Sequence, residues 1–178
     1  DKFHLVPFGE YVPFRDLLPI NKITHGSGGY SPGPGPRTVQ FPGLPPVSPL
    51  VCYEVIFPGA VMDRKNPAEW LLNLTNDGWY GATAGPYQHL AIARLRAIEE
   101  GAPMVRAAYT GVSAIIDPYG RIIQRIGLNQ IGVIDALLPK PLLRAWFLNR
   151  TIYAKFGEVI FTFFLFSGCM ICWLSSRL

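Results

Sequence analysis

Charge, cysteine and histidine are all scarce in this sequence. Of its 178 residues 16% are charged, compared with roughly 25% in soluble domains, and the net charge of +4 comes from basic residues scattered along the chain. Without a basic cluster, nucleic-acid binding is a poor hypothesis, whereas contact with an anionic lipid surface is compatible with this charge.

The few cysteines and histidines do not form a metal-binding pattern. Three cysteines are too few for a disulfide framework, and Cys169 and Cys172 make a C-x-x-C pair inside an apolar run that has no second pair of ligands. The three histidines lie far apart along the chain. The sequence therefore predicts neither a metal nor a cofactor.

Glycine and proline are abundant, and so are apolar residues. Between Pro19 and Pro49, 14 of 31 residues are glycine or proline, which predicts a long loop with a short strand near residues 38–41. Elsewhere the patterns predict strands and a helix in alternation, followed by a hairpin, and hence a mixed α/β sheet. The predicted strands lie near residues 4–7, before Cys52, and at 70–75, 104–108, 111–116, 121–126 and 130–136; the predicted helices are 60–64 and one from Pro86 to Gly101, with a helical turn at 14–18.

The C-terminal part is apolar on every face. Residues 159–174 are 16 residues without a charge, and with residues 151–156 they reach the about 20 residues that span a bilayer. This predicts a transmembrane helix over residues 151–175, joined by a basic linker, residues 139–150, to a domain over residues 1–138. Lys140, Arg144, Arg150 and Lys155 lie on the domain side and only Arg177 beyond it, which by charge alone predicts a cytoplasmic domain.

Cys52 is the candidate nucleophile. A cysteine held at the end of a buried strand, ahead of a helix N-terminus, is well placed for nucleophilic chemistry, because the helix dipole favours the thiolate. It still needs a base or a cation nearby, and Glu54 does not fill that role, since an acidic neighbour disfavours the thiolate. The alternative is that Cys52 is a small buried apolar residue.

Three motifs of the chain resemble one superfamily. They are K-x-H-L-V-P-F-G-E-Y-V-P from Lys2, C-Y-E from Cys52, and N-D-G-W-Y-G from Asn76, the last followed by G-P-x-Q-H from Gly85. Together they resemble the nitrilase, or carbon-nitrogen hydrolase, superfamily over essentially the whole chain. Within it, the run that begins at Asn76 and the apolar C-terminus are similar to the apolipoprotein N-acyltransferases of bacterial envelopes.

The resemblance implies a fold and a set of site residues. The fold is a four-layer αββα sandwich, of which this chain would hold the C-terminal part. Cys52 corresponds to the nucleophile, Lys2 to a lysine that stabilises the oxyanion, and Glu10 to a second carboxylate beside that lysine. The family's general-base glutamate lies upstream of this lysine, so the chain is expected to be a fragment that is inactive alone. The other matches are Tyr53 and Glu54 beside the nucleophile, and Trp79, Asn76 and His89 in the substrate region.

The implied reaction is a two-step acyl transfer at the bacterial inner membrane, with the domain facing the periplasm. Cys52 would take a fatty acyl chain from a phospholipid as a thioester and pass it to the α-amine of the diacylglyceryl-modified N-terminal cysteine of an apolipoprotein. The implied partners are thus a phospholipid, an apolipoprotein and the membrane. Long translocated domains largely escape the charge rule, so the count of basic residues does not exclude this topology.

Two other functions are open from the residues alone. One is a nitrilase-type amidase that hydrolyses a small amide, and the other is an inactive membrane-anchored scaffold. The site residues also have structural alternatives: Lys2 as a solvated charge, Glu10 and Glu54 as partners of Arg94 or Arg96, Asn76 and Asp77 as turn formers, and His89 as a helix residue with a structural hydrogen bond.

Overall fold

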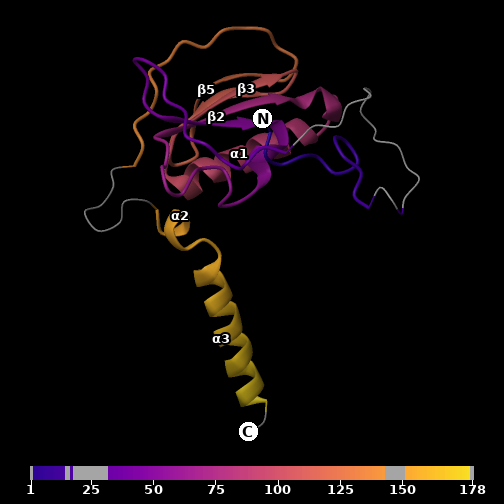
Figure 1. The fold of residues 1–178 in the computed structure, drawn as a ribbon, viewed down its shortest axis with the longest axis vertical. Helices are drawn as coiled ribbons and strands as arrows, with labels where there is room; N and C mark the ends of the chain where they lie inside the picture. The colour runs from indigo at the N-terminus through magenta and orange to yellow at the C-terminus, as the bar shows by residue number, and fades with distance from the viewer. Residues whose placement is uncertain (1, 15–16, 18–31, 143–150, 177–178) are drawn as a thin grey trace.

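The computed structural model describes residues 2–14, 17, 32–142 and 151–176, and its central feature is a five-stranded sheet (Figure 1). A long helix lies against the sheet, and a second long helix projects away from it at the C-terminus. In chain order the elements are β1 (Val47–Val51), the 3-10 helix η1 (Cys52–Ile56), β2 (Trp70–Asn76), the 3-10 helix η2 (Asp77–Tyr80), α1 (Gly85–Glu100), β3 (Met104–Tyr109), β4 (Ser113–Ile116), β5 (Ile122–Ile126), α2 (Ile152–Phe156) and α3 (Val159–Ser175).

The strands lie in the sheet in chain order, and the sheet is mixed. β1, β2 and β3 are parallel, and α1 makes the crossover from β2 to β3 that a parallel pair requires. β4 and β5 are antiparallel to their neighbours because short turns join them. In the last turn Asp117 accepts hydrogen bonds of 2.9 Å from the backbone of Tyr119 and of Arg121. The predicted mixed sheet and its C-terminal hairpin are confirmed.

The core lies between α1 and one face of the sheet (Figure 1). Leu90 and Ala93 of α1 are buried there with Leu71 of β2 and Met104 of β3. The limits of α1 follow from its ends: proline is favoured in the first turn, and Gly101 ends the helix with a left-handed φ of 63°. The helix predicted from Pro86 to Gly101 is confirmed.

The opposite face of the sheet is much more exposed. Val51 of β1, Leu74 of β2 and Ile123 of β5 are 43%, 46% and 50% exposed. The described residues therefore form one sheet with one helical layer, and the four-layer αββα sandwich that the resemblance implies is not contained in them.

Several short predicted elements are wrong. Residues 130–136 form no strand, because Ile131 and Val133 stand in solvent and none of the described strands pairs with this segment. Residues 60–64 are not helical, and the strands predicted near residues 4–7 and 38–41 are reduced to isolated bridges. An apolar pattern specifies a strand only where a neighbouring strand can satisfy its backbone groups. The predicted turn at 14–18 falls mostly outside the described residues.

The single transmembrane helix predicted over residues 151–175 is not found. The chain forms α2 and α3 instead, separated at Gly157, whose φ of 56° ends the first helix. α2 lies against α1, where the Thr151 hydroxyl donates to the carbonyl of Glu99 and Arg64 donates to that of Ala154. α3 has 17 residues, and none of the helices in the described part of the chain combines the length and apolarity needed to cross a membrane.

Candidate active site

Cys52 lies at the carboxyl end of β1, as the sequence predicts. It is half-buried, and its φ of 53° falls in the left-handed region, which costs a non-glycine residue about 1–3 kcal/mol. The 3-10 helix η1 begins at Cys52 itself, in place of the helix that the sequence predicts after Gly59. The pairing of Val51 with Leu74 anchors the strand directly before the cysteine. The thiol is thus presented at a sharp turn from a fixed strand.

Glu54 connects the nucleophile strand to the N-terminal segment. Its side chain is buried, with 1% exposure, and one carboxylate oxygen accepts the backbone N–H of Val51 at 2.6 Å. The other oxygen accepts the backbone N–H groups of Phe3 and, at 3.4 Å, of His4. A carboxylate satisfied by several backbone donors makes a strong, charge-assisted link. The link holds together two segments about fifty residues apart, one ending at Cys52 and the other beginning at Lys2.

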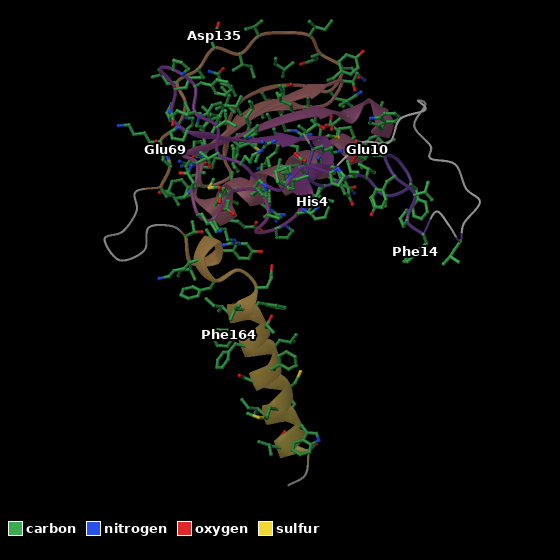
Figure 2. All side chains as sticks on the ribbon, viewed as in Figure 1. His4, Glu10, Phe14, Glu69, Asp135 and Phe164 are labelled. Carbon is green, nitrogen blue, oxygen red and sulfur yellow. The ribbon has the colours of Figure 1, made fainter. Side chains whose placement is uncertain are left out.

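Lys2 is paired with Glu10. The ammonium of Lys2 lies 2.7 Å from both carboxylate oxygens of Glu10, and their side chains are only 8% and 17% exposed. Glu10 also accepts the backbone N–H of Val6 at 2.9 Å, which fixes the loop that carries it; His4 and Glu10 mark this segment in Figure 2. Lys2 is therefore not a solvated charge. Lys2 directly precedes Phe3, whose backbone N–H donates to the Glu54 carboxylate. The same carboxylate accepts the backbone N–H of Val51, the residue before Cys52.

The alternative partners for Glu10 and Glu54 are not the ones observed. Arg94 donates to the carbonyl of Gly120 at 2.7 Å. Arg96 donates to the carbonyl of Ile56 at 2.8 Å and to Glu99 at 2.6 Å. Arg94 thus ties α1 to the β4–β5 turn, and Arg96 ties it to η1. Glu10 instead binds Lys2, and Glu54 binds the backbone of Val51 and Phe3.

Aromatic rings lie beside the nucleophile. The Tyr53 ring meets Phe57 edge-on with centroids 5.2 Å apart, and the His4 ring stacks on Phe57 at 4.0 Å. Such contacts are worth about 0.5–1.5 kcal/mol beyond the area that they bury. Phe57 thus lies between Tyr53 and His4, a residue of the segment that carries Lys2.

The substrate-region residues predicted from the motifs differ in what they contact. The Asn76 side chain accepts the backbone N–H of Gly78 at 2.9 Å and so caps η2, and Trp79 is 68% exposed. His89 is buried, and its Nδ1 lies 2.9 Å from a carboxylate oxygen of Asp77, which is a structural hydrogen bond within the fold. A substrate role for these three residues stays a prediction.

A buried polar cluster next to these residues was missed from the sequence. Arg106 on β3 is 2% exposed and donates to Asp77 at 2.7 Å and to the side-chain oxygen of Asn73. Burial lowers the pKa of Arg106, although the Asp77 charge opposes this. Burial also raises the pKa of Tyr80, to which the negative charges of Cys52 and then of Asp77 add. The sequence offers one signal for this cluster: Arg106 is the single charged residue in the otherwise apolar strand predicted at residues 104–108.

A comparison with known protein families shows the family to which this chain belongs. Residues 1–147 match the model of the carbon-nitrogen hydrolase family. The chain belongs to this family. The resemblance stated from the three motifs is thereby confirmed at the level of the family.

Among carbon-nitrogen hydrolases, several curated proteins similar to this chain carry the same name. Apolipoprotein N-acyltransferase of Rhodopseudomonas palustris is 49% identical over 162 residues, which are 89% of this chain and 29% of the relative. Apolipoprotein N-acyltransferase of Rickettsia bellii is 48% identical over 168 residues, which are 93% of this chain and 33% of the relative. The chain thus spans about a third of the length of the curated relatives that it matches. A solved amidase from Nesterenkonia sp. overlaps 56% of this chain and 40% of its own, with a TM-score of 0.44 and 25% identity.

The residues predicted for the site of this carbon-nitrogen hydrolase are of the types that nucleophilic acyl transfer uses. A cysteine sulfur attacks a carbonyl carbon readily and leaves readily, and a fixed ammonium stabilises the oxyanion formed in between. Cys52 is the candidate for the first role and Lys2, whose ammonium lies 2.7 Å from Glu10, for the second; both roles stay predictions. Within the described part of the chain, no group of three histidine, cysteine or acidic residues is arranged to hold a metal ion.

Proposed function

We propose that this chain is part of an N-acyltransferase that moves a fatty acyl chain from a phospholipid to the α-amine of a diacylglyceryl-modified cysteine at the N-terminus of an apolipoprotein. The observation that carries the proposal is the identity of 45–49% with several apolipoprotein N-acyltransferases over 88–89% of this chain. The arrangement of Cys52, Lys2, Glu10 and Glu54 supports it, because it suits acyl transfer through a thioester.

In the first step the Cys52 sulfur attacks the ester carbonyl of the phospholipid. The carbonyl oxygen becomes an oxyanion, which the Lys2 ammonium stabilises. The C–O ester bond then breaks as the C–S thioester bond forms, and the proton of the thiol passes by way of a general base to the departing lysophospholipid oxygen. The base is the glutamate that the family carries upstream of this lysine, so we propose that the described residues need the rest of the protein for activity.

In the second step the acceptor amine attacks the thioester. The C–N amide bond forms, the C–S bond breaks, and the proton lost by the amine returns to the Cys52 sulfur. The thioester favours this step because a thiolate is a better leaving group than an alkoxide. Glu54 keeps Cys52 in place through Val51, and we propose that Trp79, Asn76 and His89 belong to the part of the site that binds the substrates.

Both substrates are lipids, and we propose that the site works at the outer face of the bacterial inner membrane. The apolar side chains of α3 support this: Phe161, Phe163 and Phe164 are 64%, 66% and 67% exposed. We propose that α3 contacts membrane lipid and holds the domain close to its substrates. Figure 2 shows Phe164 on this helix, well away from the sheet.

The test is the mass of the Cys52 peptide from the full-length protein that contains this chain, purified from membranes without strong nucleophiles. We expect a fatty-acyl mass on Cys52 that hydroxylamine removes and that Lys2→Ala abolishes. Lys65→Ala, which removes an exposed lysine elsewhere in the fold, is the control and should leave the acyl mass unchanged. A thiol that stays free after incubation with phospholipid would contradict the proposal; release of ammonia from small amides would then indicate the amidase, and its absence the scaffold.

A further inference from the structure

The side chain of Arg106 joins three separate pieces of the fold. Its Nη2 donates to the Asp77 carboxylate at 2.7 Å, its Nη1 donates to the side-chain oxygen of Asn73, and its Nε donates to the carbonyl of Val112 at 3.3 Å. The guanidinium is buried with no exposed surface. Because the group is planar and rigid, these three contacts fix the positions of its partners relative to one another.

One of these contacts leads to the nucleophile. The Asn73 side-chain nitrogen donates to the carbonyl of Leu50 at 3.4 Å, so the amide lies between Arg106 and β1. Leu50 is fully buried and stands two residues before Cys52. Arg106, Asn73 and Leu50 thus form a continuous chain of hydrogen bonds from β3 through β2 to the end of β1.

The second contact leads to the substrate region. Asp77 opens η2, the turn that carries Trp79 and Tyr80. Its other carboxylate oxygen is held by the hydroxyl of Thr75 at 3.1 Å and by His89 at 2.9 Å. The cation of Arg106 therefore holds the first residue of η2 together with Thr75 and His89.

We propose that Arg106 is a positioning residue for acylation of Cys52: by binding Asn73 and Asp77 at once, it holds the end of β1 and the η2 turn at a fixed separation. This inference rests on the proposed acyl transfer. Arg106 acts from beneath the site and does not touch substrate, since it is buried. Lysine is a poor replacement, because one ammonium nitrogen cannot stand in the places of both Nη1 and Nη2, which bind Asn73 and Asp77 separately.

The experiment compares Arg106→Lys and Asn73→Ala with the wild-type full-length protein in a Cys169→Ser, Cys172→Ser background. We expect both variants to lower the rate constant of Cys52 acylation, per folded molecule, by about 10- to 100-fold, because a misplacement of about 1 Å costs about that much. The phospholipid concentration for half-maximal rate should stay unchanged. The matched control is Arg121→Lys, which makes the same change in an ion pair with Asp117 on the β4–β5 turn and should acylate normally.

A second measurement does not depend on the proposed function. Alkylation of Cys52 by iodoacetamide needs no lipid and reports the thiolate fraction and the accessibility of the sulfur, which change when the end of β1 moves. We expect it to slow about tenfold in both variants. Variants that melt at a lower temperature but acylate and alkylate at wild-type rates per folded molecule would overturn the inference. If Arg106→Lys fails to fold, the rates of Asn73→Ala alone decide whether the inference holds, because Asn73→Ala keeps the Arg106–Asp77 ion pair. If wild type forms no thioester, the proposed function fails, and the alkylation rates alone decide the inference.

Discussion

Asp77 is a carboxylate with no exposed surface, and its charge depends on its neighbours. Burial alone would raise its pKa, but the hydrogen bond with His89 and the charge of Arg106 hold the pKa of Asp77 below its ordinary value of 3.8. The unfolded chain therefore binds this proton more readily than the folded chain. It follows that Asp77 stabilises the fold fully above about pH 4 and that this stabilisation is lost as the pH falls through the lower, folded pKa.

Replacing Asp77 with asparagine should therefore change how stability depends on pH. We expect Asp77→Asn to lower the free energy of unfolding at neutral pH by about 3–5 kcal/mol, since it leaves Arg106 buried without its anion. We also expect the variant to lose less stability than wild type between about pH 5 and pH 2.5. Urea unfolding at a series of pH values measures both effects.

The control for this change is Asp135→Asn, which removes an exposed carboxylate on the loop at the edge of the sheet (Figure 2). Its unfolding should follow the wild-type pH dependence. An acid loss as steep in Asp77→Asn as in wild type would show that the carboxylate does not carry this stability.

At the scale of elements, the C-terminal end of α1 is where the chain beyond the sheet attaches. Gly101 ends the helix with a φ of 63°, and its carbonyl accepts the backbone N–H of Leu142 at 2.9 Å. In the same place the Thr151 hydroxyl donates to the carbonyl of Glu99. A single glycine thus serves both as the helix end and as the surface on which residues 142 and 151 rest.

A side chain at Gly101 should loosen this attachment. A Cβ there would lie 2.7 Å from the Thr151 methyl and 3.3 Å from Leu142, in addition to the strain of a positive φ. We expect Gly101→Ala to cost about 2–4 kcal/mol and to speed hydrogen exchange in α2, whose first turn Thr151 caps. Thermal unfolding and hydrogen exchange test this.

Gly43→Ala separates the strain from the clash. Gly43 has a φ of 76°, and a Cβ added there would meet none of the described residues within 4 Å apart from its neighbours in the chain. Its replacement should therefore cost only about 1 kcal/mol and leave α2 unchanged. Equal losses in the two variants would mean that the contacts with Thr151 and Leu142 do not hold α2 in place.

At the scale of the whole molecule, the described residues form a sheet domain and a projecting apolar helix (Figure 1). If α3 contacts lipid as we propose, its cysteines should be shielded although they are exposed on the protein. In vesicles that hold the full-length Cys52→Ser protein, we expect Cys169 and Cys172 to react with a charged maleimide at least about tenfold more slowly than in denaturant. A cysteine introduced by Ile131→Cys, in the exposed loop after β5, should react quickly in both. Equal rates at the two sites in vesicles would exclude lipid contact at α3.

The sequence by itself determined the parts of this protein that depend on local pattern. Apolar periodicity, proline and glycine predicted α1 and the strands β2 to β5, because turn and helix-end preferences act over a few residues. The motifs predicted Cys52, Lys2 and Glu10 as neighbours, and the structure adds the bond between Lys2 and Glu10.

Only the tertiary structure decided how distant segments meet. The sequence did not show that Glu54 binds the backbone of Phe3, about fifty residues away, or that Arg106 reaches Asn73. The second contact exists because the parallel register places Asn73 directly beside Arg106, and a shift of one residue would turn the arginine to the other face. Register depends on both strands together and on the buried face that they share, so one strand read alone does not show which residue lies beside Asn73. The same reason explains the failure at residues 130–136, where the pattern of a strand finds no partner among the described strands.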